Sequence, residues 1–306
     1  MSTPESKLNL MPNLVPQGEI KTHSPGTSCL SVGGINLSYL ENGKGPLVLL
    51  LHGFPDTAYT WKRTLSVLAD NGYRGVALFM RGYEPSDIPA DGDYTIKSLA
   101  TDVLSLVAQF GEEKAALVGH DWGAHAAYAA AAIGAERLSC ICTLAIAPYP
   151  LLESGVRELC ARPHNLYLGF GKPACWWLRR NDFREIDRLY KRWSPHWRVP
   201  DSHIRKVKSA FSDPARTQAA LGYYSAPFSD QDRKAIVRNI EVPTLVIYGT
   251  DIPPVREDSY ANASQAVDAA CTVKGIRKVG HWPHLEAPDL FEQELLSFLR
   301  VHHPAG

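Results

Sequence analysis

The chain has 306 residues, of which 45% are hydrophobic and 21% are charged, so it can bury a core of ordinary globular composition. Lysine plus arginine and aspartate plus glutamate both total 32, which gives a formal net charge of zero. A neutral chain without a large basic block gives no electrostatic reason to expect nucleic acid or a membrane as a partner. These totals do not bear on the oligomeric state.

The N-terminus and the cysteines indicate a cytoplasmic protein. The first residues lack a basic start followed by an apolar core, so we expect no signal peptide, and no apolar run approaches the length of a membrane span. The six cysteines form no CxxC pair, which favours reduced thiols. No group of histidines and cysteines has ligand spacing, so we expect no metal and no cofactor.

The predicted elements begin with a β-hairpin and continue as alternating strands and helices. Residues 28–41 predict the hairpin around Gly33-Gly34, and the apolar run at 46–53 is typical of a strand buried on both faces. Such an alternation predicts a parallel sheet that helices cover on both sides. Helices are expected near 58–71, 95–110 and 123–133, and further strands at 74–79, 114–119 and 138–146.

The pattern changes at about residue 148. From there to about 228 the buried-strand runs stop, and the segment holds four of the seven tryptophans together with many arginines. Strand patterns return at 242–249 and 272–280. We therefore predict a core formed by residues 1–147 and 229–306, with 148–228 inserted as a helical cap over the carboxyl ends of the strands, where such sheets bind ligands.

The segment Gly119-His120-Asp121-Trp122-Gly123 has the pattern of a nucleophile elbow. It follows a predicted strand, precedes a predicted helix, and has small residues two positions before and after the central one. The next backbone N–H, that of Trp122, lies at a helix N-terminus and can bind developing negative charge. The competing interpretation is that Asp121 is only a helix N-cap.

The partners of such a nucleophile follow it in the order acid, then histidine. Asp251 comes directly after the strand at 242–249, and His281 directly after the strand at 272–280. Asp251 has a competing interpretation as a turn residue, with Asp258 or Glu257 as substitute acids, and His284 competes with His281. The second oxyanion N–H is expected from Phe54, in the loop after the strand at 46–53.

These motifs resemble one family. The segments HGFP, GHDWG and GHWPHLEAP, together with Asp251, are similar to α/β-hydrolase-fold proteins of the epoxide hydrolase and haloalkane dehalogenase branch, over roughly residues 28 to 300. The resemblance implies an α/β-hydrolase fold with a mostly parallel sheet of about eight strands and a helical cap. Residues 78–86, LFMRGYEPS, depart from the family's frequent Pro-Asp-x-Arg-Gly-Tyr-Gly-x-Ser.

An aspartate at the elbow suits displacement at a saturated carbon. Its attack gives an ester whose carbonyl belongs to the enzyme, and water activated by His281 can attack that carbonyl and regenerate Asp121. Asp251 would orient His281 and stabilise its imidazolium form. The sequence therefore predicts an epoxide hydrolase that needs only its substrate and water, working through a covalent aspartyl ester.

The two candidate reactions differ in their leaving group, which is an alkoxide for an epoxide and a halide for a haloalkane. An alkoxide leaving group needs a proton, and the resemblance implies two acids on the cap. One is Tyr224, in the segment Gly222-Tyr223-Tyr224. The other is His164, at the position where the family usually has its second tyrosine, with Tyr167 as the alternative. A halide needs only N–H donors, and Phe54 stands where dehalogenases commonly keep asparagine. The alternatives are thus a haloalkane dehalogenase, or a non-catalytic ligand-binding protein of the same fold.

Overall fold

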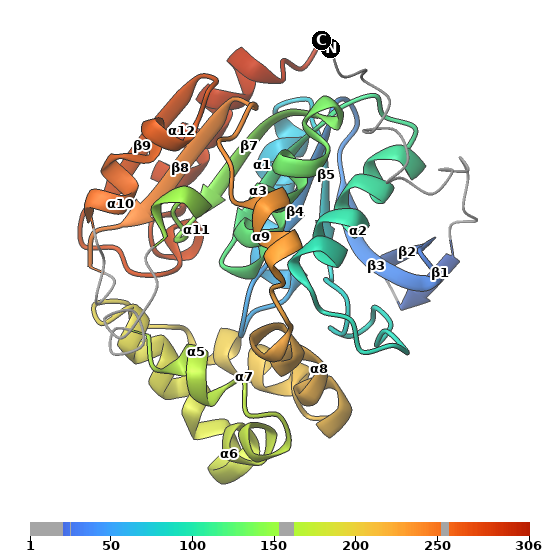
Figure 1. Ribbon diagram of the computed structural model, residues 1–306, viewed down its shortest axis with the longest axis vertical. Helices are drawn as coiled ribbons and strands as arrows, with labels where there is room; N and C mark the ends of the chain where they lie inside the picture. The colour runs from blue at the N-terminus through green and yellow to red at the C-terminus, as the bar shows by residue number, and fades with distance from the viewer. Residues whose placement is uncertain (1–20, 25, 153–161, 252–256) are drawn as a thin grey trace.

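The computed structural model describes residues 21–24, 26–152, 162–251 and 257–306. In these ranges one sheet has the strand order β1-β2-β3-β5-β4-β6-β7-β8-β9 (Figure 1). The first three strands pair antiparallel, β3 joins β5 antiparallel, and the remaining neighbours are parallel. The strands are β1 (Lys21–Ser24), β2 (Thr27–Val32), β3 (Ile35–Asn42), β4 (Leu47–Leu51), β5 (Arg74–Leu78), β6 (Ala115–His120), β7 (Leu138–Leu144), β8 (Thr244–Gly249) and β9 (Cys271–Ile276).

The predicted alternation of strands and helices is confirmed, and the sheet has nine strands in the described ranges where about eight were predicted. The addition is the edge strand β1, which has no distinctive sequence pattern. The helices of the core are α1 (Lys62–Asp70), α2 (Ile96–Gln109), α3 (Trp122–Ile133), α9 (Asp230–Ile236), α10 (Glu257–Ala261), α11 (Pro283–Glu286) and α12 (Pro288–His302). Short 3-10 turns lie at η2 (Ala58–Trp61), η3 (Ala135–Arg137), η4 (Tyr149–Leu151) and η5 (Ala263–Ala266).

Strand β4 shows why the sheet is covered on both faces. All five of its residues are buried. Leu47, Leu49 and Leu51 pack in the cluster that includes α2 and α3, whereas Val48 and Leu50 pack in the cluster that includes α1 and α12. Because alternate residues of a strand point to opposite faces, a continuous apolar run is what this position requires.

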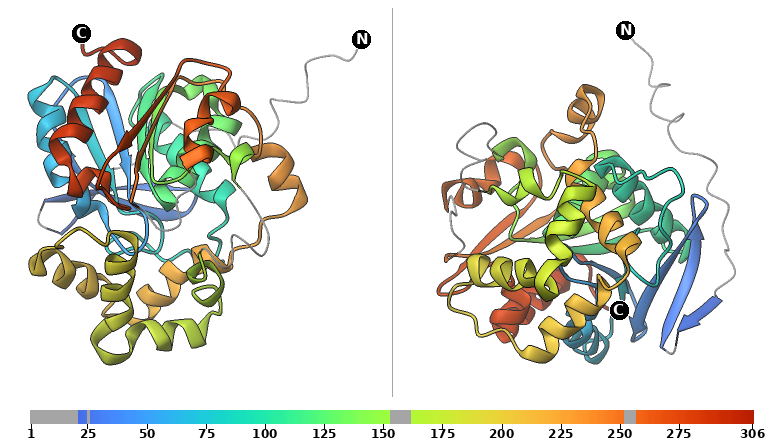
Figure 2. Two further views of the ribbon diagram at one scale, coloured as in Figure 1. Left: turned by 90° about the vertical axis from the view of Figure 1, so that its left-hand side faces the viewer. Right: turned by 90° about the horizontal axis from the view of Figure 1, so that it is seen from below.

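Four helices lie together beyond the carboxyl ends of the parallel strands (Figures 1 and 2). They are α5 (His164–Tyr167), α6 (Lys172–Trp193), α7 (Asp201–Ala210) and α8 (Pro214–Ser225). Helix α6 is interrupted by a turn at Arg180–Phe183, in which Asn181, Asp182 and Phe183 have left-handed backbone. We propose that residues 148–228 form the cap, as the sequence predicts; residues 153–161 of this segment lie outside the described ranges.

Within the described residues, no helix has both the length and the apolar composition that crossing a bilayer requires.

Candidate active site

Asp121 lies on a strained turn between β6 and α3. Its backbone has φ 52° and ψ −116°, a conformation that residues with a Cβ rarely adopt. The turn needs small neighbours, because a Cβ on Gly119 would lie 2.2 Å from the carbonyl oxygen of Gly123, and one on Gly123 would lie 2.2 Å from that of Leu51. This geometry explains the two glycines and is that of a nucleophile elbow.

The carboxylate of Asp121 is held by groups from two other loops. Its Oδ1 accepts a hydrogen bond from the Phe54 N–H at 2.9 Å, and its Oδ2 lies 3.4 Å from Nε2 of His281. A Cβ on Gly53 would lie 2.4 Å from the Cβ of Asp121, so the loop after β4 approaches as closely as its backbone allows. The side chain of Asp121 caps no N–H of α3, so the N-cap interpretation is wrong.

The carboxyl group of Asp121 is ionised at neutral pH. Burial raises the pKa of its carboxyl, but contact with His281, the nearby His120 and the Phe54 N–H outweigh burial and hold that pKa well below the ordinary value. The N–H of Trp122 belongs to the first turn of α3, where no carbonyl of the helix is available to accept a hydrogen bond from it. The two N–H groups expected to form an oxyanion hole thus come from residues that adjoin this carboxylate.

One cavity of about 280 Å³ brings most of the predicted site residues together. Its lining combines the elbow, the histidine loop and the cap. The lining residues are Ile96, Asp121, Trp122, His125, Ala145, Ile146, Arg162, His164, Asn165, Trp193, Tyr224 and His281.

The structure separates His164 from Tyr167. His164 lines the cavity, its ring contacts that of Trp193 at 4.6 Å, and its buried Nδ1 has no hydrogen-bond partner among the described residues. Burial lowers its pKa to about 3, so its ring is neutral. Tyr167 lines a different hollow on the cap and donates a hydrogen bond to Glu185 Oε1 at 2.8 Å. The geometry therefore favours His164 over Tyr167 as the second group opposite Asp121.

Tyr224 stands on α8 with its ring fixed by aromatic contacts. Its centroid lies 5.4 Å from that of Phe54 and 5.2 Å from that of Trp122, both edge to face, and 6.5 Å from that of His164. Burial, together with the charge of Asp121, raises the pKa of its phenol well above the ordinary value. Tyr224 therefore keeps its proton and can donate it into the cavity.

Among the described residues, Asp251 forms no hydrogen bond or ion pair with His281. Its Oδ1 accepts from the Thr250 hydroxyl at 2.9 Å, and its Oδ2 lies 3.3 Å from Nε2 of the cap residue His196. The acid loop and the histidine loop nevertheless adjoin, because the Asp251 N–H donates to the Val279 carbonyl at 3.0 Å. The role of Asp251 as the orienting acid therefore stays a prediction.

Glu286 organises the loop that carries His281, a role that the sequence did not indicate although Glu286 is part of the motif GHWPHLEAP. Its carboxylate accepts from the Gly280 N–H at 2.8 Å, from the Trp282 N–H at 3.0 Å, and from the Ser194 hydroxyl at 2.6 Å. Ser194 ends α6 of the cap, and the His281 N–H donates both to its Oγ at 2.9 Å and to the Trp193 carbonyl at 3.0 Å. The cap thus helps to hold this histidine.

His284, the competitor of His281, lies outside the cavity. Its Nε2 is 2.8 Å from the Thr60 hydroxyl, and its ring stacks on Trp61 at 4.4 Å. His52 fixes two loops, since its Nε2 accepts the Met80 N–H at 3.2 Å and its Nδ1 therefore carries the proton toward the Gly53 carbonyl at 3.0 Å. Both residues have structural contacts rather than access to the cavity.

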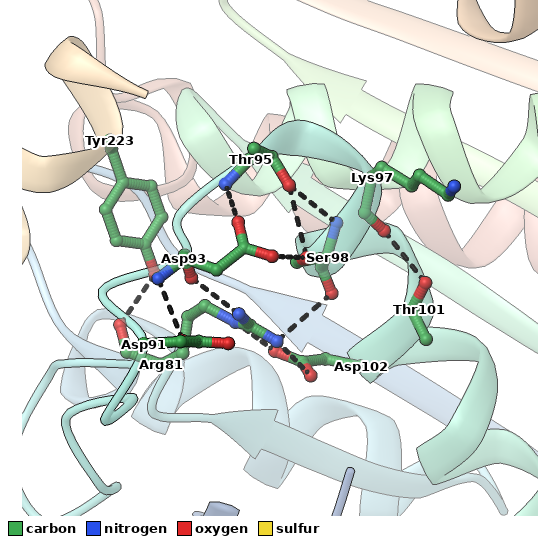
Figure 3. Close-up of polar contacts among 9 residues, drawn as sticks. All are labelled: Arg81, Asp91, Asp93, Thr95, Lys97, Ser98, Thr101, Asp102 and Tyr223. Atoms are coloured by element: carbon green, nitrogen blue, oxygen red, sulfur yellow. Dashed lines mark hydrogen bonds and ion pairs between the residues drawn. The ribbon is translucent and has the colours of Figure 1, made fainter. Parts of the chain in front are cut away.

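A buried network holds the helix of Tyr224 on the core (Figure 3). The Tyr223 hydroxyl donates to the Arg81 carbonyl at 2.8 Å, and the Arg81 guanidinium pairs with both oxygens of Asp102 at 2.7 Å. Arg81 also donates to the Asp93 carbonyl at 2.6 Å. Arg81 lies in the segment 78–86 that departs from the family pattern, and its ion pair gives that segment a fixed conformation.

Among the described residues, no group of three or more histidine, cysteine, aspartate or glutamate side chains is placed to hold a metal ion.

Known proteins resemble this chain over most of its length. The family described as alpha/beta hydrolase fold matches residues 46–288. The AB hydrolase superfamily protein YfhM of Bacillus subtilis is 29% identical over 90% of this chain and 99% of its own. Epoxide hydrolase A of Mycobacterium tuberculosis is 27% identical over 90% and 98%. The crystal structure of epoxide hydrolase A from Mycobacterium thermoresistibile superimposes with a TM-score of 0.77 at 24% identity, covering 93% of this chain and 98% of that one.

Proposed function

Because the chain belongs to the α/β-hydrolase fold family, we propose that it hydrolyses epoxides to vicinal diols through a covalent ester on Asp121. The observation that carries this proposal is one cavity with a carboxylate at the elbow and two cap donors, Tyr224 and His164. The similarity to Epoxide hydrolase A of Mycobacterium tuberculosis, which extends over nearly the whole length of that protein, supports the same reaction. No cofactor enters the proposal.

In the first step an oxygen of Asp121 attacks an epoxide carbon and the ring C–O bond breaks. Oδ1 is engaged by the Phe54 N–H, so Oδ2 is the nucleophile. The epoxide oxygen takes the proton of Tyr224, while the neutral His164 ring donates a hydrogen bond to it. Both donors are needed because an alkoxide is a poor leaving group in an apolar cavity.

In the second step water attacks the carbonyl carbon of the aspartyl ester. His281, whose Nε2 is 3.4 Å from Oδ2, takes the water proton. Negative charge develops on Oδ1, where the Phe54 N–H already binds and the Trp122 N–H can join it.

As the intermediate collapses, the acyl C–O bond breaks and the diol oxygen takes the proton from His281. The carboxylic acid formed on Asp121 then gives its proton to the phenolate of Tyr224, which restores both residues. Asp251 would stabilise the imidazolium form of His281 once its carboxylate leaves His196 and turns to His281. The acid loop and the histidine loop adjoin, so this movement is short.

The haloalkane dehalogenase alternative has weaker support. A halide would need free N–H donors beside Asp121, whereas the Phe54 N–H is already bonded to the carboxylate. Tyr224 and His164 would have no role in halide release. The non-catalytic alternative is disfavoured by the ionised Asp121 and by the nearness of His281.

Trapping the ester tests the proposal. We expect the variant His281→Gln to gain the whole mass of an epoxide, because the first step proceeds and the second does not. Intact-protein mass spectrometry after exposure to epoxide and haloalkane panels measures this gain, and Asp121→Ala/His281→Gln is the matched control that should gain nothing. A gain equal to an alkyl group without its halide would indicate dehalogenation, and no gain from either panel would contradict turnover by this route.

The contact of the cap with Glu286 predicts a selective effect on the second step. We expect Ser194→Ala to slow ester hydrolysis by about 10-fold or more, because the hydrogen bond to a carboxylate and the support of the His281 N–H are lost together. Ester formation should keep its rate, so the ester should accumulate during turnover. Rapid quenching followed by mass spectrometry separates the two steps, with the exposed Ser66→Ala as control. Equal slowing of both steps would contradict a role in positioning His281.

A further inference from the structure

His125 lines the same cavity as Asp121 but has no part in the proposed reaction. It lies four residues after Asp121, in the first turns of α3, and the side chains of both residues line this cavity. The cap donors Tyr224 and His164 and the water-activating His281 account for every proton transfer described above. A polar ring in this cavity therefore needs another explanation.

The ring of His125 is held in one orientation. Its Nδ1 lies 2.9 Å from the Tyr149 hydroxyl, and its ring centroid is 5.2 Å from that of Trp122. Tyr149 is itself packed between Tyr128, at 6.0 Å, and Phe228, at 6.3 Å between ring centroids. Rotating the imidazole would break its bond to a hydroxyl that is fixed on both sides.

The second ring nitrogen is left for a ligand. In the described part of the chain, the hydrogen bond of His125 uses Nδ1, and no protein group bonds to Nε2. Nε2 is also not among the fully buried polar atoms that lack a hydrogen-bond partner, so it keeps accessible surface on a ring that lines the cavity. A substrate group in the cavity can therefore reach this nitrogen.

The character of this nitrogen defines the group it can bind. Burial lowers the pKa of His125 to about 4, so the ring is neutral at pH 7 and one nitrogen donates while the other accepts. The Tyr149 hydroxyl can bond to Nδ1 in either tautomer, which leaves Nε2 as an acceptor or as a donor. A hydroxyl both donates and accepts, so it is satisfied by either form.

We propose that Nε2 of His125 binds a hydroxyl group of the substrate, so that this protein prefers epoxides carrying a hydroxyl substituent to purely alkyl epoxides. This inference rests on the proposed function and adds the substrate class. Because Asp121 and His125 line one cavity of about 280 Å³, the hydroxyl lies within a few carbon atoms of the epoxide ring. The alcohol and the epoxide thus occupy neighbouring parts of one cavity.

The experiment compares pairs of epoxides in which a methyl group replaces a hydroxyl. The pairs are glycidol with 1,2-epoxybutane, 3,4-epoxy-1-butanol with 1,2-epoxypentane, and 5,6-epoxy-1-hexanol with 1,2-epoxyheptane. We expect kcat/KM of the unmodified protein to favour the alcohol by about 10-fold in at least one pair, as one hydrogen bond in a closed site would give. His125→Leu should abolish that preference, and His125→Gln should keep part of it.

Two further variants sharpen the comparison. Tyr149→Phe frees the imidazole to rotate, so it should weaken the preference without removing a group from the reaction. Ile96→Val changes an apolar residue of the same cavity and should alter both members of a pair equally. The same variants are also combined with His281→Gln, and the ester formed from each epoxide is measured by mass spectrometry. This measurement compares the two members of a pair in the first step alone.

The outcomes distinguish this inference from the function on which it rests. Equal kcat/KM for both members of every pair, or a preference that survives in His125→Leu, would overturn the inference alone. No turnover of any pair, together with no ester on His281→Gln from these six or from other epoxides, would overturn the proposed function and the inference with it. A preference lost in His125→Leu and kept in Ile96→Val would support it.

Discussion

Replacing Asp121 by alanine is expected to lower kcat for epoxide hydrolysis by a factor of about 10⁴ or more, the scale seen when a covalent nucleophile is removed. Among the described residues that line the cavity, Asp121 is the only carboxylate, so none of them can substitute for it. Turnover of an epoxide, followed as diol formation, measures the loss. The exposed Asp70→Ala is the matched control and should keep full activity.

The same residue predicts part of the pH profile. The pKa of the Asp121 carboxyl is held below its ordinary value, so the nucleophile stays ionised as the pH falls through the usual range of aspartate. Loss of kcat/KM on mild acidification must therefore come from another group. The assignment of Asp121 as the nucleophile would be contradicted by an Asp121 variant that keeps substantial activity and no longer loses kcat/KM at low pH.

Breaking the ion pair between Arg81 and Asp102 is expected to lower the free energy of unfolding by about 3–5 kcal/mol, because the remaining charge is left buried without its partner. Both residues are buried, and the two hydrogen bonds of 2.7 Å are charge-assisted. Urea unfolding of Arg81→Met and of Asp102→Leu measures the effect. The double variant should recover much of the loss, since it leaves neither charge alone.

An exposed pair offers the control for this measurement. Arg238 and Glu241 form an ion pair on the surface, with side chains 43% and 56% exposed. Surface pairs contribute about 1 kcal/mol or less, so Arg238→Met should change stability little. If Arg81→Met were equally mild, water would have to reach the Asp102 carboxylate, and the network in Figure 3 would not be what fixes α8.

The parts of the fold that local patterns encode were predicted from the sequence. The apolar run of β4 is continuous because both of its faces are buried. The glycines around Asp121 are required because a Cβ on either of them would lie 2.2 Å from a carbonyl oxygen. Such requirements act within a few residues, so they leave a readable pattern. Tyr224 and His164 were expected from the family resemblance instead, and both line one cavity with Asp121.

The parts that depend on side-chain direction across the cap could not be predicted this way. Tyr167 and His164 are three residues apart, yet Tyr167 turns to Glu185 and His164 turns into the cavity. Asp251 has the expected place in the chain, but a cap histidine, His196, lies against its carboxylate. The partners in these contacts come from segments that are distant in the sequence or from a separate helix. No periodicity in the chain indicates them.

The cap is fastened to the core on two sides of the cavity. On one side Ser194 bonds to Glu286, and on the other Tyr223 bonds to the Arg81 carbonyl. Because hydrogen bonds hold the cap to the core on both sides, the cap cannot move away to admit a bulky molecule without breaking them. We therefore expect the cavity beside Asp121, of about 280 Å³, to admit small substrates and to exclude bulky ones before any reaction begins.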